Sequence, residues 1–509
     1  MAYLMGIDVG TTGSKTLLIG EGGDVTASAT VEYPMHTPHP LWAEQDPADW
    51  WRATVETIKE VLAGADASEV KALGLTGQMH GLVLLDKSGE VLRPCIMWND
   101  QRTGPQCRAI IERLGLDKII EWTANPVLPG FTAPKIVWVR ENEPEVYARA
   151  ARVLLPKDFI RYKLTGEFAT DKAGASGTSL FNVVKRTWSQ EMVEALDIPV
   201  EWLSPPYEGP EVTGTVTSQV AEFTGLPEGL PVIAGAGDQE AQAVGTGIVR
   251  QGLVSATLGT SGVVFAHTDE AQVDSHGRLQ SYCHAVPGRW HVMGVMLSAG
   301  GSFRWFRDTL GRLEKATAGL TGCDPYEYLT AAAATAPVGS EGLIFLPYLT
   351  GERMPHSDPN ARGAFFGLTV RHDKPHLVRA VMEGVAYGLR DLLELVRDFG
   401  LGIEQVRASG GGARSEVWRQ ILADVFATEL VTINVTEGAA YGAALLAGVG
   451  AGIYSSVEEA CDATIRVVTS TEPKPEHADL YNAYYPVYRS LYGALKPAFD
   501  AVAQVVAAV

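Results

Sequence analysis

Residues 3–19 read YLMGIDVGTTGSKTLLI, and their pattern predicts a β-hairpin near the start of the chain. Residues 3–8 are apolar, residues 10–13 form a turn rich in glycine and threonine, and residues 15–19 are apolar again. Glycine lets a backbone approach a ligand closely, and the N–H groups and threonine hydroxyls of such a turn can donate hydrogen bonds to phosphate oxygens. An ordinary hairpin turn without a ligand is the alternative.

The carboxylate of Asp8 stands at the end of the first of these strands. It would repel a phosphate, but it can hold Mg²⁺, directly or through water, and the ion then bridges the phosphate oxygens. The turn is not a Walker A loop, which needs glycine where Ser14 and Val9 stand. The dinucleotide-binding fingerprint also fails, because Glu240 and Ser415 occupy the positions of its third glycine. An HExxH zinc motif and a GxSxG hydrolase motif are absent from the sequence as well.

A similar pattern returns about 250 residues later. Residues 253–258 are strand-like, residues 259–262 form a Gly-Thr-Ser-Gly turn, and residues 263–266 are strand-like again. Two duplicated domains would produce this repeat, and chance similarity between two glycine-rich turns is the alternative. A run of three glycines follows at residues 410–412.

The rest of the chain mixes strand and helix signals, which predicts an α/β architecture with antiparallel hairpins. A length of 509 residues corresponds to about three domains, or two large ones. We expect strands at residues 25–33, 70–75, 82–85 and 91–97, and a helical segment from about residue 476 onward. Pro47 opens a further helix that runs to about residue 63, with Asp46 as its N-cap.

Acidic residues outnumber basic ones, with 60 Asp and Glu against 41 Lys and Arg and a formal net charge of −19. This balance argues against nucleic acid or an anionic membrane as a partner. The first ten residues lack the pattern of a signal peptide, and no apolar run approaches the ~18 residues of a membrane span. The five cysteines are scattered, so we expect reduced, mostly buried thiols in a soluble cytoplasmic protein. A monomer and a homodimer both remain open.

Three glycine-rich segments carry a resemblance to a known fold. Residues 8–15, 259–262 and 409–413 resemble, in this order, the two phosphate loops and the adenosine loop of the actin/hexokinase/Hsp70-type ATPase fold. Over essentially its whole length the chain resembles the FGGY family of carbohydrate kinases. Residues 130–138, GFTAPKIVW, are similar to the first signature of that family, and residues 363–368, GAFFGL, with the segment 376–383 are similar to the second.

The resemblance implies an α/β protein of two actin-like ATPase (ribonuclease H-like) domains around a central catalytic cleft. Residues 1–248 would hold the sugar site, the first phosphate loop and the catalytic Asp, and residues 249–509 the second phosphate loop and the adenosine loop. ATP and Mg²⁺ are the implied cofactors, with Asp8 holding the metal through water. Lys15 would neutralise a terminal phosphate or else point into solvent. The implied nucleotide-binding residues are Thr11, Thr12, Gly13, Lys15, Gly259, Thr260, Ser261, Gly410, Gly411, Gly412 and Ser415.

Other segments, among them residues 76–81, are similar to the family members that phosphorylate D-xylulose. By this resemblance Met79 and His80 lie on the sugar, and Asp238 is the catalytic base. For Asp238 the alternative is an N-cap of the helix that we expect from about residue 239, along which Glu240 would face away. Gln239 is also placed at the substrate, although those members often carry Asn there and glycerol kinases carry Gln.

A second polar edge of the sugar site is expected from Asn99, Asp100 and Arg102. Trp98 beside them is expected to be either a platform for the sugar or a core residue. A salt bridge within the loop is the alternative for this polar cluster.

The expected activity is transfer of the γ-phosphoryl group of ATP to the terminal hydroxyl of D-xylulose, giving D-xylulose 5-phosphate in pentose catabolism. A kinase of ribulose or glycerol is an alternative that Gln239 keeps open. A non-catalytic ATP-switched protein of the same fold, chaperone-like or filament-forming, is another. Such a protein needs no base at the γ-phosphate, so Asp238 argues against it.

Overall fold

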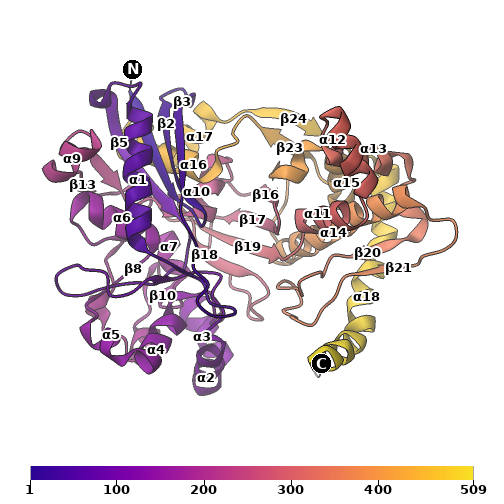
Figure 1. Ribbon diagram of the computed structural model, residues 1–509, viewed down its shortest axis with the longest axis horizontal. Coiled ribbons are helices and arrows are strands. Elements are labelled where there is room, and N and C mark those ends of the chain that lie inside the picture. Colours follow the sequence, from indigo (N-terminus) through magenta and orange to yellow (C-terminus); the bar gives the residue numbers. More distant parts are fainter. Residues whose placement is uncertain (1, 508–509) are drawn as a thin grey trace. The chain divides into compact units, whose positions relative to one another are not determined.

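The computed structural model describes residues 2–507, which fold into two compact α/β units (Figure 1). The first unit consists of residues up to 250 together with residues 267–291 and 435–466. The second consists of residues 251–266, residues 292–434 and the chain from residue 467 on. The α/β class predicted from the sequence is confirmed.

The first unit is built on a mixed sheet that contains the predicted hairpin. Strand β1 (Tyr3–Val9) pairs antiparallel with β2 (Gly13–Gly20) and parallel with β5 (Val70–Gly77). With β3 (Val25–Glu32), β13 (Val212–Thr215) and β14 (Pro231–Ile233), the strand order is β13-β14-β5-β1-β2-β3. The hairpin therefore lies beside the centre of the sheet, where it is held on both sides.

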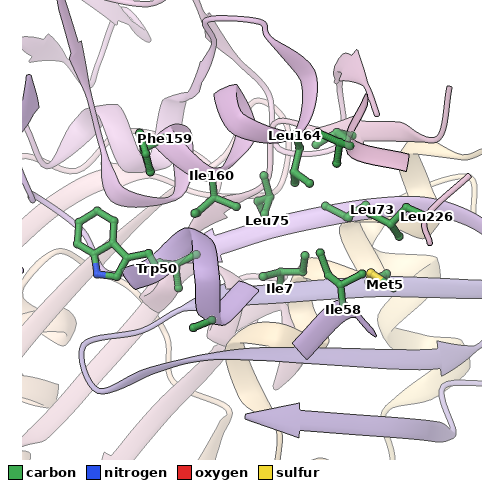
Figure 2. Close-up of a cluster of buried hydrophobic side chains, with 14 of the residues drawn as sticks. Met5, Ile7, Trp50, Ile58, Leu73, Leu75, Phe159, Ile160, Leu164 and Leu226 are labelled. Atoms are coloured by element: carbon green, nitrogen blue, oxygen red, sulfur yellow. The ribbon is translucent and has the colours of Figure 1, made fainter. Parts of the chain in front are cut away.

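Helices cover both faces of this sheet. On one face lie α1 (Pro47–Leu62) and α6 (Pro156–Thr165), and their apolar side chains meet those of β1 and β5 in the core drawn in Figure 2. On the other face lies α16 (Gly438–Gly450), next to α10 (Asp238–Gly245). A Cβ on Gly6 would come within 1.9 Å of the Ala440 carbonyl oxygen, so α16 lies directly on the backbone of the sheet. The predicted cap of α1 is also confirmed, because the Asp46 carboxylate accepts from the Ala48 N–H.

The second unit repeats the strand pattern of the first. Strand β16 (Leu253–Leu258) pairs antiparallel with β17 (Gly262–Thr268) and parallel with β22 (Gln405–Ser409). With β19 (Trp290–Met296), β23 (Leu430–Ile433) and β24 (Val467–Thr471), the strand order is β24-β23-β22-β16-β17-β19. As in β13-β14-β5, the pair at the end is antiparallel and the next pair is parallel. This agreement favours duplicated domains over a chance repeat of the turn.

The predicted strand at residues 91–97 is shorter than expected. Only Cys95–Ile96 (β7) form a strand there, paired with Glu44–Gln45 (β4). The other short strands are β6 (Val83–Leu85), β8 (Arg152–Leu154), β9 (Thr170–Asp171), β10 (Phe181–Asn182), β11 (Thr187–Trp188), β12 (Pro206–Tyr207), β15 (Ala236–Gly237), β18 (Gln280–Cys283), β20 (Ile344–Leu346) and β21 (Ala364–Phe366).

The predicted C-terminal helix is present as α18 (Pro475–Ala507). The remaining helices are α2 (Gly104–Leu114), α3 (Leu116–Thr123), α4 (Thr132–Asn142), α5 (Pro144–Arg149), α7 (Lys172–Ser176), α8 (Gln190–Ala195), α9 (Ser218–Thr224), α11 (Gly300–Thr309), α12 (Arg312–Thr321), α13 (Pro325–Thr335), α14 (Lys374–Asp398), α15 (Glu416–Phe426) and α17 (Val457–Thr464). None of the helices within residues 2–507 combines the length and the apolar character that crossing a membrane requires.

All five cysteines are free thiols. Four of them are buried, as expected, whereas Cys323 is exposed.

Candidate active site

The predicted phosphate turn, residues 10–13, is fixed by hydrogen bonds that its carbonyl groups accept. The Gly10 N–H closes the turn onto the Gly13 carbonyl oxygen at 3.1 Å. The Tyr33 hydroxyl donates to the Gly10 carbonyl oxygen at 2.6 Å, and the Tyr33 N–H donates to that of Thr12 at 3.2 Å. A Cβ on Gly13 would lie 2.8 Å from the Val31 carbonyl oxygen, so glycine is needed there. The turn is thus a fixed structure that includes the predicted residues Thr12 and Gly13.

Asp8 meets a structural requirement of a cation site. Its Oδ1 atom is buried and has no hydrogen-bond partner among residues 2–507. Burial raises the pKa of the Asp8 carboxyl to about 6, against the opposing charge of Lys15. A buried, unpartnered carboxylate oxygen beside a phosphate turn fits Mg²⁺. Within the same residues no cluster of three or more His, Cys, Asp or Glu side chains could hold a metal, so the ion would take most of its ligands from water and phosphate.

Lys15 lies on β2, directly across the hairpin from Asp8. Its ammonium pairs with the carboxylate of Glu437 within the first unit. Burial lowers the pKa of Lys15, and the charge of Asp8 opposes this. The ammonium therefore has a protein partner in this structure.

Asp238 opens α10 at the edge of the sheet where β1 and β5 end. The preceding strand β15 pairs with the end of β5, with Gly237 opposite Gly77. Gly237 is the N-cap residue of α10, so Asp238 is not the helix cap that the alternative required. Burial raises the pKa of Asp238 to about 7, and the negative charge of Asp8 adds to the increase. A carboxyl that titrates near neutral pH is suited to general-base catalysis.

The two residues that follow Asp238 differ in burial. Gln239 is half-buried, and its hydrogen bonds to Asp238 oppose the rise in the pKa of that carboxyl. Glu240 is fully buried and lies 3.5 Å from His291, measured from Oε1 to Nε2. Burial raises the pKa of Glu240 well above its ordinary value, which favours its neutral form. Asp238, which is half-buried, is thus the carboxyl within reach of a ligand.

His80 is held in one orientation by the loop that follows β5. Its backbone is left-handed, with φ = 67°, and its Nδ1 atom lies 2.7 Å from the Gly177 carbonyl oxygen. Because a carbonyl oxygen only accepts, Nδ1 carries the hydrogen. The ring stacks on Phe131 with centroids 4.6 Å apart, and the His80 carbonyl oxygen accepts from Lys135 Nζ at 2.9 Å. The first signature segment therefore supports His80, and Phe131 and Lys135 are site residues to which sequence reasoning gave no role.

Met79 connects this loop to the strand end that carries Asp238. A Cβ on Gly237 would meet Met79 Cγ and Sδ at 2.8 and 2.9 Å. A Cβ on Gly177 would meet the His80 ring at 2.4 Å and Met79 Cε at 3.4 Å. The structure thus brings Met79, His80 and the residue before Asp238 together, as the resemblance implied.

The second polar edge is divided between an exposed and a buried part. The Trp98 indole N–H donates to Thr11 Oγ1 at 3.0 Å, and the Asn99 amide lies 3.6 Å from Met35 Sδ in an exposed loop. Arg102 is buried instead, and its guanidinium pairs with Asp100 at 2.7 Å. It also pairs with Glu44 at 2.8 Å and lies over the ring of Trp42. These contacts are those of the salt-bridge alternative for Arg102.

A cavity of about 550 Å³ lies within the second unit. Its volume is within the range of small-molecule sites. Of the predicted nucleotide residues, Gly259, Thr260, Gly411, Gly412 and Ser415 line it, while Ser261 and Gly410 adjoin these in sequence. The other lining residues are Leu258, Gly300, Phe303, Arg304, Asp324, Tyr326, Glu327, Thr330, Arg414 and Trp418.

Backbone contacts fix the two glycine-rich loops of this cavity, residues 259–262 and 410–412. The Gly300 N–H donates to the Gly259 carbonyl oxygen at 2.8 Å, and the Ala299 N–H donates to that of Thr260 at 2.9 Å. Gly410 has φ = 85°, and a Cβ on it would lie 2.5 Å from the Leu258 carbonyl oxygen. The wall from α11 and α13 was not predicted, although the Gly-Gly pair at residues 300–301 is a local signal that could have pointed to it.

Comparisons with known proteins agree with these features. A model of the N-terminal domain of the FGGY family of carbohydrate kinases matches residues 3–245, and a model of its C-terminal domain matches residues 254–451. The chain is 42% identical over 496 residues to the xylulose kinase of Escherichia coli (strain K12), covering 97% of this chain and 99% of that protein. It is 36% identical over 494 residues to the xylulose kinase of Bacillus subtilis (strain 168), covering 97% of each. The crystal structure of the xylulose kinase from Rhodospirillum rubrum is similar with a TM-score of 0.91 at 33% identity, covering 98% of this chain and 100% of that one.

Proposed function

The chain belongs to the FGGY family of carbohydrate kinases, and we propose that it transfers the γ-phosphoryl group of ATP to the terminal hydroxyl of D-xylulose, giving D-xylulose 5-phosphate. One structural observation carries the proposal. A half-buried carboxyl with a pKa of about 7, that of Asp238, stands beside the loop that carries Met79 and His80. The likeness to xylulose kinases over nearly the whole chain supports the choice of sugar.

In the proposed reaction, Asp238 accepts the proton of the terminal hydroxyl while the hydroxyl oxygen forms a bond to the γ-phosphorus. The bond between that phosphorus and the bridging oxygen breaks, and ADP leaves. His80 and Met79 orient the ketose so that this hydroxyl faces the carboxylate. Thr11, Thr12 and Gly13 would hold phosphate oxygens through the turn. Mg²⁺ at Asp8 would neutralise charge on the phosphates.

The second unit supplies the nucleoside part of the proposed site. The cavity beside Gly411 and Gly412 would hold the adenosine, because glycine lets the backbone lie against the base and ribose. The turn at Gly259, Thr260 and Ser261 would contact the phosphates. We propose that residues 1–248 hold the sugar site, the first phosphate loop and the catalytic Asp. Residues 249–509 would hold the second phosphate loop and the adenosine loop.

Location and assembly follow from the same proposal. A kinase that uses ATP and Mg²⁺ for pentose catabolism belongs in the cytoplasm, where free thiols such as these stay reduced. A monomer and a homodimer would be distinguished by light scattering of the purified protein.

The function is tested by measuring ADP release with D-xylulose, D-ribulose and glycerol at saturating Mg²⁺ and ATP. We expect D-xylulose to give the highest kcat/KM, and phosphorus NMR to show a 5-phosphate product. A higher kcat/KM for glycerol or D-ribulose would assign another substrate, in line with Gln239. ADP release that none of the three compounds increases would instead favour an ATP-switched protein without kinase activity.

A further inference from the structure

The first unit contains two buried glutamine side chains. They join the phosphate turn to the loop that carries Met79 and His80, called the sugar loop below. Gln45 ends β4, and Gln78 lies between the end of β5 and Met79; both are 1% exposed. We propose that this glutamine pair couples ketose binding at Met79 and His80 to the geometry of the phosphate turn. Gln45 and Gln78 are thus positioning residues, and this role rests on the proposed function.

The contacts of Gln45 fix the orientation of its amide. Its Oε1 atom accepts from the indole N–H of Trp50 at 3.0 Å, and an indole can only donate. Its Nε2 group donates to the Thr11 carbonyl oxygen at 2.7 Å and, more weakly, to that of Pro34 at 3.4 Å. Rotating the amide by half a turn would place oxygen against carbonyl oxygens. Gln45 therefore has one stable orientation, in which it holds the turn.

Gln78 continues the same network toward the sugar loop. Its backbone N–H donates to the Val9 carbonyl oxygen at 3.0 Å. Its Nε2 group donates to the Gly10 carbonyl oxygen at 3.3 Å and to Gln45 Oε1 at 3.1 Å. Gln78 Oε1 is buried without a hydrogen-bond partner among residues 2–507. Both hydrogens of the amide are thus used to hold the turn and its neighbour.

Together the two glutamines hold three successive carbonyl groups, those of Val9, Gly10 and Thr11. In a trans peptide the N–H points opposite to the C=O of the same unit. Fixing the carbonyls of Gly10 and Thr11 therefore aims the N–H groups of Thr11 and Thr12 away from the glutamines. These are N–H groups that the proposed reaction needs for the phosphates.

A movement of the sugar loop reaches this network through a single peptide. Met79 follows Gln78 directly, and His80 is held by Lys135 and Gly177. When a ketose contacts Met79 and His80, any shift of their backbone moves Gln78, and through it the carbonyl groups of the turn. A ketose bound at Met79 and His80 would therefore influence how the turn aligns ATP for transfer. Without the pair, water has more chance to replace the sugar hydroxyl and hydrolyse ATP to ADP and phosphate.

The test compares the Gln45→Leu, Gln78→Leu and double variants with wild type, with Gln190→Leu as control. Gln190 is exposed, and its amide donates to Glu194 on the surface of α8. We expect each single variant to lower kcat by about 10- to 100-fold, because the phosphates are misplaced rather than unbound. The dissociation constant of D-xylulose, measured by calorimetry, should stay within about threefold of wild type. The ratio of ADP release with ketose to release without it should fall.

The double variant shows whether the two amides act as a unit. If they do, its kcat should be close to that of the worse single variant. If the kcat losses of the two single variants multiply in the double variant, the coupling is overturned. The same holds if the ratio of ADP release with ketose to release without it equals that of wild type. Should a leucine variant fail to fold, Gln78→Asn shortens the side chain but keeps the amide, and the same ratio decides. A wild-type protein without ketose-dependent ADP release would overturn the proposed function itself, which is a different result from active wild type with uncoupled losses.

Discussion

Asp238 is the side chain whose replacement separates catalysis from structure most clearly. Asp238→Asn keeps the size of the side chain but cannot accept the hydroxyl proton. We expect kcat to fall about 10²–10⁴-fold, roughly 3–5.5 kcal/mol in the barrier. Binding of D-xylulose and of ATP should change only a few-fold. Steady-state kinetics and calorimetry on the same preparation measure both.

The matched control for this substitution is Glu240→Gln. Glu240 is buried, and its raised pKa favours a neutral carboxyl that an amide resembles in shape and charge. We expect this variant to keep most of its kcat. A fully active Asp238→Asn enzyme, checked for contamination by wild type, would contradict the assignment of Asp238 as the base.

The same carboxyl makes stability depend on pH. The pKa of Asp238 is about 7 in the folded chain, against an ordinary value of 3.8. Between these values the folded state binds more protons at this site than the unfolded state, so the site loses stability as pH rises. Asp238→Asn does not titrate, and its stability relative to wild type should therefore increase from about pH 4 to about pH 7 and then level off. Denaturant unfolding of both proteins without ligands at several pH values measures this difference, and a constant difference would show that the pKa is not raised.

His80→Ala should weaken ketose binding while leaving nucleotide affinity nearly unchanged. The ring is held by Gly177 and Phe131 at the sugar loop, and the contacts that hold the phosphate turn come from other residues. Calorimetry with D-xylulose and with ADP measures the two affinities. His276→Ala, at an exposed position of the same unit, is the control. Equal losses for both ligands would place His80 in a purely structural role.

Helices α10 and α16 pack so closely that glycine is required where they touch. A Cβ on Gly442 would lie 1.8 Å from the Ala241 carbonyl oxygen. Gly442→Ala must therefore push the helices apart, and we expect it to lower the free energy of unfolding by about 1–3 kcal/mol. Because α10 begins with Asp238, kcat should fall as well.

The control for this substitution is Gly493→Ala, in the middle of α18. A Cβ there meets no atom within 4 Å, so the variant should be neutral or more stable by up to about 1 kcal/mol. Thermal and denaturant unfolding measure both variants. If Gly442→Ala were as stable as Gly493→Ala, the close contact between α10 and α16 would not hold in solution.

Across the whole molecule, the sequence predicted correctly the elements that depend on short sequence patterns. The first hairpin, the helix that Asp46 caps and the second glycine turn each depend on neighbouring residues, and all three are confirmed. The roles of the predicted site residues stay predictions. The contacts that hold these residues in place join positions far apart in the sequence. No local sequence pattern predicts such contacts. Gly177 lies 97 residues from His80, and Glu44 lies far in sequence from Arg102, with which it pairs.

The first unit is discontinuous, and this allows a test with fragments. Residues 435–466 belong to it, and α16 covers the sheet face that carries Gly6 and Gly74. A fragment of residues 1–250 would expose this face, so we expect it to be unfolded or aggregated, with weak near-ultraviolet circular dichroism. Adding residues 435–466 through a flexible linker should recover ordered structure. A fragment of residues 1–250 with a cooperative unfolding transition would contradict this expectation.

The position of α16 also affects the order of events during translation. The β1–β2 hairpin leaves the ribosome well before α16, which follows more than 400 residues later. Until then one face of the first sheet lacks α16, and at about 5–20 residues per second that interval is tens of seconds. During this time the nascent chain presents β1 and β5 to its surroundings, where they can be bound by a chaperone or pair with another nascent chain. The hairpin is therefore made long before it reaches its final packing against α16.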